Sequence, residues 1–322
     1  MNKRSNLKHL ILLLMAALAI VACGGSDDPE NPDVNPSQTN VNRNNTAQNA
    51  VYGRMEFPRL KGGSNNIAII HTVPEFGVNY CVEWDSDLKP EGWTPEGTLR
   101  SQRWSCYQMH AGNSASNTQR WKGDDSIEFG LYPNDPDLNK AYRFTRDPYR
   151  NSGYDHGHIC PSADRLFSQL VNKQTFYMTN MQPQVNGFNA KVWANMEAQV
   201  RRWNTANFRD TLYVVKGGTI DRWDQIITTI GSGQNKIPVP KFFFMAVLCK
   251  KNTNSTTGGY RALGFWIQHK SNSDTDLRPY VVSIDELERL TGIDFFCNLP
   301  DQYEQIVESL SREQVLRAWN LE

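Results

Sequence analysis

The alternation of apolar and polar positions predicts two strands at the front of the chain. Residues 68–72 and 78–84 are apolar, β-branched or aromatic at most positions, and Pro74 and Gly77 separate the two runs. Proline and glycine between two such runs are typical of a turn that joins neighbouring strands. The run from Trp84 to Trp121 is rich in Trp, Gly and Pro and is expected to be dominated by loops.

The middle of the chain carries the clearest pattern. A strand is expected to start at Tyr154 and to leave His158 at its end, and a β-prone run over 176–181 is expected to break at Pro183. A helix is predicted over 189–203, because its apolar residues recur on one face at the 3.6-residue period. These residues are Val192, Trp193, Met196, Val200 and Trp203.

The last third of the chain mixes strands with helices. Strands are predicted over 211–216, 242–249 and 262–268, and the second of these is a continuous apolar run typical of a buried strand. A capping box at Ser283–Glu286 predicts the start of a short helix, and a final amphipathic helix is expected over 302–319. Strands and helices without regular alternation favour an α+β fold.

The first residues resemble an export signal with a lipid attachment site. Residues 1–22 have a basic start and thirteen apolar residues before Cys23, which follows Ile-Val-Ala. This stretch is short for a membrane span. Lipoprotein processing is the preferred interpretation, and the alternatives are a plain cleaved signal and a transmembrane anchor. Lipidated Cys23 and a disordered tether are expected over 23–50, holding the protein to the outer membrane on its periplasmic or outer surface.

Residues 51–322 are expected to form one domain, because they contain no repeat and no second linker. The whole chain has a net charge of zero, which argues against a generally basic nucleic-acid binder. Basic residues nevertheless outnumber acidic ones between Tyr142 and Trp203, and such a local patch suits a polyanion. A solvated basic face is the alternative. The basic residues are Arg143, Arg146, Arg150, Arg165, Lys173, Lys191, Arg201 and Arg202.

Five cysteines remain after Cys23, and none forms a CxxC spacing, so a zinc site is not expected. In an oxidising compartment these cysteines are candidates for disulfides. The preferred pairings are Cys81–Cys106 and Cys249–Cys297, with Cys160 left free, although connectivity does not follow from sequence.

A set of polar residues between 155 and 197 resembles the motif of a known family. The set is Asp155-His156-Gly157-His158, Asn180, Pro183-Gln184, Asn189 and Glu197. It is similar to the ββα-metal (His-Me finger) motif of the DNA/RNA non-specific endonucleases, the family of endonuclease G and of secreted sugar-non-specific bacterial nucleases. The resemblance implies the ββα-metal nuclease fold, with a mixed, mainly antiparallel central sheet flanked by helices.

The resemblance also implies roles for individual residues. His158 would be the general base, since a neutral imidazole titrates near working pH. Asn189 would bind one hydrated Mg²⁺, or Mn²⁺ or another divalent ion, through its amide oxygen. Glu197 lies two helical turns after Asn189 and would hold a metal-bound water. The alternative is a plain ion pair with Arg201.

The remaining candidates would surround the phosphate. Arg165 and Arg201 would contact it, while Asp155, Asn180 and Gln184 would position water or substrate, with ordinary structural hydrogen bonding as the alternative. His156 departs from the family, which has an arginine there. A histidine offers no guanidinium fork, so another arginine would have to substitute, or activity would be lower. His156 as the base is the alternative to His158.

These residues predict a Mg²⁺-dependent endonuclease that cuts DNA and RNA to 5′-phosphate ends and contacts the nucleic-acid backbone without reading sequence. Two alternatives stay open at this point. One is a lipoprotein that binds nucleic acid without cutting it, because of the change at His156. The other is a phosphodiesterase that acts on a different polyanionic ester.

Overall fold

The computed structural model describes residues 40–93, 97–253 and 255–322. The expected signal peptide (1–22), Cys23 and the first part of the tether lie outside the described residues. From Asn40 onward the chain forms one compact unit. Over the described part of the chain, no helix is long and apolar enough to cross a membrane.

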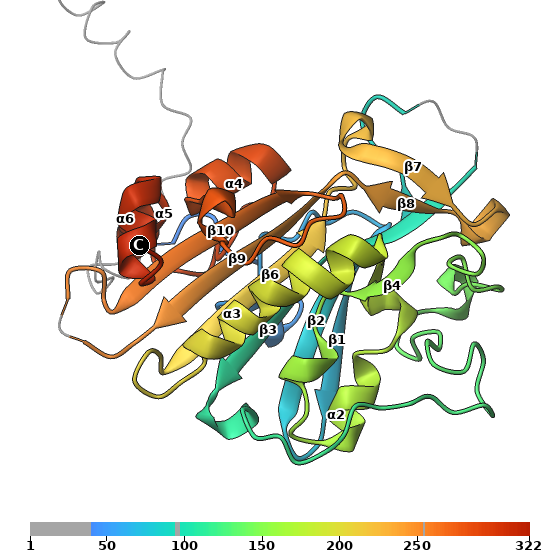
Figure 1. Cartoon of the computed structure of the whole chain (residues 1–322), viewed down its shortest axis with the longest axis horizontal. Helices are drawn as coiled ribbons and strands as arrows, with labels where there is room; N and C mark the ends of the chain where they lie inside the picture. Colours follow the sequence, from blue (N-terminus) through green and yellow to red (C-terminus); the bar gives the residue numbers. More distant parts are fainter. Residues whose placement is uncertain (1–39, 94–96, 254) are drawn as a thin grey trace, which may run out of the picture. The chain divides into compact units, whose positions relative to one another are not determined.

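A seven-stranded sheet forms the centre of this unit, in the order β1-β2-β3-β6-β9-β10-β11 (Figure 1). Every neighbouring pair in it is antiparallel. The strands are β1 (Asn66–Val73), β2 (Gly77–Leu88), β3 (Leu99–His110), β6 (Thr211–Gly218), β9 (Phe242–Lys250), β10 (Tyr260–Gln268) and β11 (Val281–Val282). The predicted α+β class, with a mainly antiparallel sheet, is confirmed.

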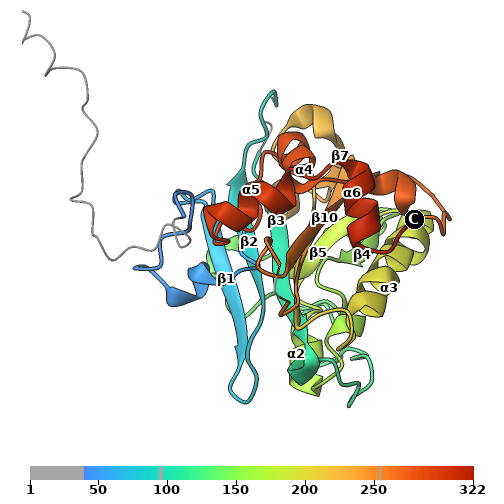
Figure 2. The ribbon, with the colours of Figure 1, turned by 90° about the vertical axis from the view of Figure 1, so that its left-hand side faces the viewer.

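Both faces of the sheet are covered, which explains the continuous apolar run of β9. Successive residues of β9 point to opposite faces, so Phe243 joins one hydrophobic core and Phe244 joins the other. The first core lies beneath α3 (Ala194–Trp203), and the second lies beneath α4 (Ile284–Thr291). Figures 1 and 2 show α3 and α4 on the two sides of the sheet.

Smaller elements complete the fold. They are two two-stranded ribbons, β4 (Asp155–His158) with β5 (Met181–Gln184) and β7 (Ile226–Ile230) with β8 (Ile237–Pro240), and the helices α2 (Gln169–Gln174), α5 (Asp301–Glu308) and α6 (Arg312–Ala318). The predicted start of α4 at Ser283 is confirmed, because the Ser283 side chain accepts a hydrogen bond from the amide of Glu286. The Glu286 side chain binds Arg289 instead of completing the capping box. Gly292 ends this helix in the left-handed region, with φ of 72°.

The prediction of loops between Trp84 and Trp121 was wrong where β3 stands. This twelve-residue strand is buried along most of its length, yet more than half of its residues are polar. Arg103 shows why it is stable: its guanidinium donates to Asp85 at 3.3 Å and to Asp221 at 2.7 Å. Polar side chains that find partners inside the protein can be buried, and they then hide the apolar alternation that marks a strand.

Two predicted boundaries were also wrong. Pro183 does not end a strand, because it lies inside β5 and pairs with His156 across the ribbon. Residues 176–180 before β5 form turns and one short helical turn instead of a strand. The final helix over 302–319 is two helices, α5 and α6, separated at Ser311, whose side chain caps the second.

Residues 40–50 were expected to belong to the disordered tether, but they are packed against the domain. Asn44 is only 3% exposed. Its amide nitrogen donates to the carbonyl of Pro58 at 2.9 Å, and its oxygen accepts from the amide of Leu60 at 3.0 Å. Asn40 adds a bond to the carbonyl of Leu299. The compact unit therefore begins about ten residues earlier than predicted.

The five cysteines of the described chain are buried thiols in this structure. Cys81 on β2 lies directly opposite Cys106 on β3, which is the placement that the preferred Cys81–Cys106 disulfide requires. Cys249 faces the core beneath α3, whereas Cys297 packs at the carbonyl of Phe57, a residue of the other core. The expected Cys249–Cys297 pairing is therefore wrong, because the sheet separates the two.

Candidate active site

The ribbon β4–β5 and the helix after it form one strand–strand–helix unit. The chain leaves β5, passes through a π-helical segment at Phe188–Trp193, and continues into α3. The apolar face predicted for this helix is confirmed, since Val192, Trp193 and Met196 are buried against the sheet. The opposite face and the end of β4 enclose a pocket of about 430 Å³. Among its lining residues are His158, Asn189, Glu197, Asp155, His156 and Arg120.

His158 presents an unused acceptor to this pocket. Its Nε2 atom is buried and has no hydrogen-bond partner in the structure. The ring packs edge-on to Phe176, with 4.8 Å between the ring centroids. Burial, followed by the positive charges of Arg120 and His156, lowers the pKa of His158 well below its usual value. The imidazole is therefore neutral at working pH, which is the form that accepts a proton.

Asn189 is oriented by Asp155. The amide nitrogen of Asn189 donates to Oδ2 of Asp155 at 3.0 Å, and the same oxygen accepts from Asn186 at 3.0 Å. Because the nitrogen is held by a carboxylate, the amide oxygen of Asn189 is the atom left to face the pocket. Asp155 thus fixes the orientation of the Asn189 amide.

Glu197 is tied to a buried lysine from the sheet. Its Oε1 accepts from Nζ of Lys216 at 2.6 Å, and Lys216 is only 1% exposed. The Lys216 ammonium also lies 4.8 Å from the centroid of the Trp193 ring. Burial raises the pKa of Glu197, and the charge of Lys216 offsets part of that rise. The alternative of a Glu197–Arg201 ion pair is not realised, because each residue has another partner.

His156, at the position where the family has an arginine, lies between two tyrosine rings. Tyr132 stacks on one face with 3.8 Å between centroids, and Tyr149 stacks on the other at 4.0 Å. Nε2 of His156 lies 3.1 Å from a carboxylate oxygen of Asp147. This packing fixes the ring and makes it a poor substitute for a mobile guanidinium.

Arg120 brings a guanidinium to the pocket from a distant part of the sequence. It is exposed, lines the pocket, and lies 4.6 Å from the centroid of the Phe176 ring. Sequence reasoning missed it, as it missed Tyr132. Neither residue belongs to a motif, and Arg120 follows β3 in a segment without periodicity, so only the tertiary structure reveals their proximity to His158.

The two arginines predicted to contact phosphate differ in position. Arg201 donates to Asp164 at 2.8 Å, and a third of its side chain is exposed. Arg165 is fully buried, lies over the Tyr107 ring and donates to the carbonyl of Gln108. The prediction that Arg165 contacts the phosphate is therefore contradicted, because a buried guanidinium cannot reach substrate.

Asn180 and Gln184 hold the frame of the site. Asn180 is fully buried, accepts from the amide of Cys160 at 2.9 Å and donates to the carbonyl of Thr175 at 2.7 Å. Gln184 is also fully buried, and a Cβ added at Gly157 would collide with its side chain. Ordinary structural hydrogen bonding, the alternative named for both, describes Asn180. It does not describe Gln184, because neither polar atom of its buried side-chain amide has a hydrogen-bond partner in the structure.

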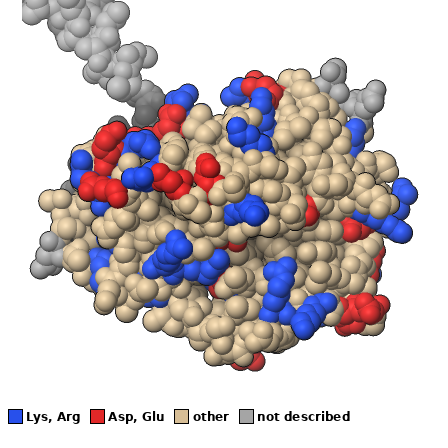
Figure 3. All heavy atoms as spheres, viewed as in Figure 1, with Lys and Arg blue, Asp and Glu red and all other residues tan. Residues whose placement is uncertain are grey.

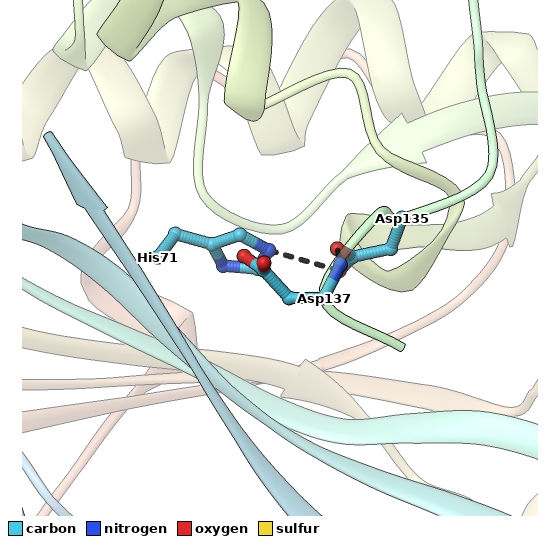
Figure 4. Close-up of side chains that lie close together, drawn as sticks. All are labelled: His71, Asp135 and Asp137. Carbon is cyan, nitrogen blue, oxygen red and sulfur yellow. Dashed lines mark hydrogen bonds and ion pairs between the residues drawn. The ribbon is translucent and has the colours of Figure 1, made fainter. Parts of the chain in front are cut away.

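A second group of potential metal ligands lies outside the pocket. His71 on β1 points toward Asp135 and Asp137 (Figure 4). Nε2 of His71 is 2.8 Å from Oδ2 of Asp135, and the Thr179 hydroxyl donates to the same oxygen. None of these three ligands lines the pocket that holds His158. The buried His71–Asp135 pair is hydrogen-bonded internally, and its position in the core suits a role in the fold.

Basic residues also line a second groove near the pocket. Figure 3 shows lysine and arginine side chains spread over the face that carries α3. A groove of about 720 Å³ adjoins the pocket through Asp147, the partner of His156, and is lined by the exposed residues Arg146 and Arg150. A polyanion bound at the pocket would find positive charge along this groove.

A histidine and an asparagine on a strand–strand–helix unit, with arginines around them, define a class of metal-assisted phosphodiester hydrolases. The family model of the DNA/RNA non-specific endonucleases matches residues 95–302. The chain belongs to this family, and it is a hydrolytic endonuclease with nucleic acid as substrate.

Several similar proteins support the assignment of the chain to this family. A nuclease of Nostoc sp. is 29% identical over 247 residues, covering 73% of this chain and 86% of that protein. Mitochondrial nuclease 1 of Schizosaccharomyces pombe is 32% identical over 173 residues, covering 52% of this chain and 53% of that protein. A crystal structure of the EndoG/EndoGI complex shares the fold, with a TM-score of 0.56 and 23% identity over 74% of this chain and 90% of that one.

Proposed function

We propose that this endonuclease cuts both DNA and RNA to 5′-phosphate ends with the help of Mg²⁺. The observation that carries the proposal is the meeting of His158, Asn189 and Glu197 in one pocket. They come from β4, from the helical segment after β5 and from α3, and they supply an unpartnered nitrogen base, an amide oxygen and a carboxylate.

The donor set fits a hydrated Mg²⁺ ion, and Mn²⁺ or another divalent ion in its place. Asn189 would hold the ion through its amide oxygen, which Asp155 orients, and Glu197 would hold one of its waters. A neutral amide and a single carboxylate are hard ligands that leave several positions to water, as Mg²⁺ prefers. When bound, the ion would neutralise charge on the phosphate and stabilise the leaving 3′ oxygen.

The chain's own residues would carry out the proton transfer. Nε2 of His158 would take a proton from a water molecule as the water oxygen bonds to phosphorus. The bond from phosphorus to the 3′ oxygen then breaks, and that oxygen becomes a hydroxyl after taking a proton. The product keeps the phosphate on its 5′ end. His158 is preferred to His156 as the base, because His156 is held by Asp147 and two tyrosines.

Metal removal gives the first test. The purified full chain is expected to digest plasmid DNA and RNA in MgCl₂, and to lose both activities in EDTA, with recovery on adding MgCl₂. Asn189→Ala should need a much higher Mg²⁺ concentration for the same rate, whereas Asn195→Ala, on the same helix outside the pocket, should behave as wild type.

Two outcomes would contradict the nuclease activity itself. Intact substrates with a retained gel shift would mean a protein that binds nucleic acid without cutting it. Hydrolysis of a small phosphodiester with intact DNA and RNA would mean a different polyanionic or small ester as substrate. Full activity in EDTA would contradict the metal requirement alone.

Arg120 is proposed to supply the guanidinium that the family places at His156. Arg120→Ala is expected to lower kcat about 100-fold, because a preorganised donor to the phosphate in the transition state is lost. Arg120→Lys should recover only part of the rate, since an ammonium lacks the planar fork. Lys122→Ala is the matched control, because Lys122 is exposed on the same segment but does not line the pocket. Equal effects of the Arg120 and Lys122 variants would show a general charge effect.

We also propose that Cys23 is lipidated and anchors the protein at the outer membrane. The support is the sequence of residues 1–23, with its basic start, apolar core and small residue before the cysteine. Residues 24–39 would then link the lipid anchor to the described domain. Labelling with palmitate tests the anchor directly: label that persists in Cys23→Ser would contradict it.

A further inference from the structure

Three carboxylates from two helices meet on the face of the sheet opposite to α3. Asp285 and Glu288 belong to α4, and Glu308 is the last residue of α5. One carboxylate oxygen from each lies within 4.8 Å of those of the other two. The helices α4 and α5 pack beside each other (Figure 2). Three negative charges at this separation repel one another unless a cation or protons lie between them.

Glu308 makes the arrangement more than a surface cluster. Its side chain is only 4% exposed, and its Oε1 atom is buried without a hydrogen-bond partner in the structure. An unpaired buried acceptor of this kind is costly in a folded protein. Its place at the end of α5 adds to the cost, because the carboxyl end of a helix carries partial negative charge.

Among the residues that the structure describes, no basic side chain forms an ion pair with Glu308. The charges that act on it most strongly are the carboxylates of Glu288, Glu304, Asp285 and Asp294. Burial and these charges raise the pKa of Glu308 to about 10. The nearest arginine along α4, Arg289, is already bound to Glu286 at 2.6 Å on the exposed side of that helix.

We propose that Asp285, Glu288 and Glu308 bind one Ca²⁺ ion that joins α4 to α5. Carboxylate oxygens are the ligands Ca²⁺ prefers, and it accepts six to eight oxygens in flexible geometry. Three carboxylates supply up to six of them. Asp285 is exposed, so the ion can enter from solvent and keep water on that side.

This cation site is separate from the nuclease pocket. None of its three ligands lines that pocket, and the sheet lies between the two sites. The bound ion would hold the C-terminal helices to the sheet. The proposal does not depend on the metal requirement of the nuclease reaction, so either can fail without the other.

Thermal unfolding of the full chain tests the site. After removal of metals with EDTA and dialysis, CaCl₂ at about 100 times its dissociation constant is expected to raise Tm by about 5 °C or more. MgCl₂ should give a smaller shift, because Mg²⁺ keeps its waters and demands octahedral geometry. In Glu308→Gln the Ca²⁺ shift should disappear.

Matched variants separate this site from other effects. Asp285→Asn changes an exposed ligand and should also remove the Ca²⁺ shift, so the test does not depend on Glu308→Gln folding. Glu286→Gln, on the same helix but paired with Arg289, should keep the shift, and so should Asn189→Ala in the nuclease pocket. If CaCl₂ leaves the wild-type Tm unchanged, or shifts Glu308→Gln equally, the carboxylates share protons instead and the proposal is overturned.

Discussion

His158→Ala is expected to lower kcat on plasmid DNA and on RNA by two to four orders of magnitude, because it removes the only proton acceptor proposed for the attacking water. The loss should be in kcat with little change in KM, since His158 is proposed to act in the transition state. Steady-state digestion with MgCl₂ in excess measures both constants. The fold should persist, because Nε2 of His158 has no hydrogen-bond partner to lose.

Two further variants sharpen this expectation. His110→Ala changes a half-buried histidine outside the pocket and should keep the wild-type rate. His156→Ala should reduce the rate less than His158→Ala, because His156 is held between tyrosine rings and bound to Asp147. If His158→Ala keeps more than a tenth of the wild-type kcat, or if the loss is greater in His156→Ala, the assignment of the base is wrong.

Glu197→Ala is expected to lower the free energy of unfolding by about 3 kcal/mol as well as the nuclease rate. Lys216 is 1% exposed, and its ammonium would be left buried without the carboxylate at 2.6 Å. Breaking a buried ion pair by removing one partner typically costs about 3–5 kcal/mol. Urea unfolding of wild type and variant measures the loss.

A double variant separates stability from activity at the same site. Glu197→Gln combined with Lys216→Met removes both charges and fills similar volume, so it should recover most of the stability lost in Glu197→Ala. It should not recover the nuclease rate, because the carboxylate that faces the pocket is still missing. A loss below about 1 kcal/mol in Glu197→Ala would contradict the proposed role of this pair in the fold.

The candidate site could be predicted largely because its core is local in sequence. His158 ends β4, and Asn189 and Glu197 follow on one helical stretch, so all three fall within the segment that resembles the family motif. The roles proposed for Asp155 and Asn189 are compatible with the hydrogen bond between them. The expectation for Arg165 failed, because a charged residue in a basic stretch is normally exposed, and here stacking on Tyr107 buries it.

Buried polar residues account for most of the other errors. The strand β3 was missed because Arg100, Gln102 and Arg103 interrupt its apolar pattern, although all three are buried. Asn44 has the same effect in the segment expected to be disordered, since its side chain bonds to backbone groups of the domain. Prediction from sequence patterns treats polar residues as solvent-exposed. It fails where distant segments of the chain supply hydrogen-bond partners that allow a polar side chain to be buried.

The sequence by itself determined the class of fold, the resemblance to the family and the helix that carries Glu197, because these depend on local periodicity and on motif spacing. The tertiary structure alone decided which charges meet. It brings Arg120 to the pocket, pairs Lys216 with Glu197, and gathers Glu308 with Asp285 and Glu288. Such contacts join residues far apart in the chain, and they depend on how helices pack against the sheet, which no local pattern records.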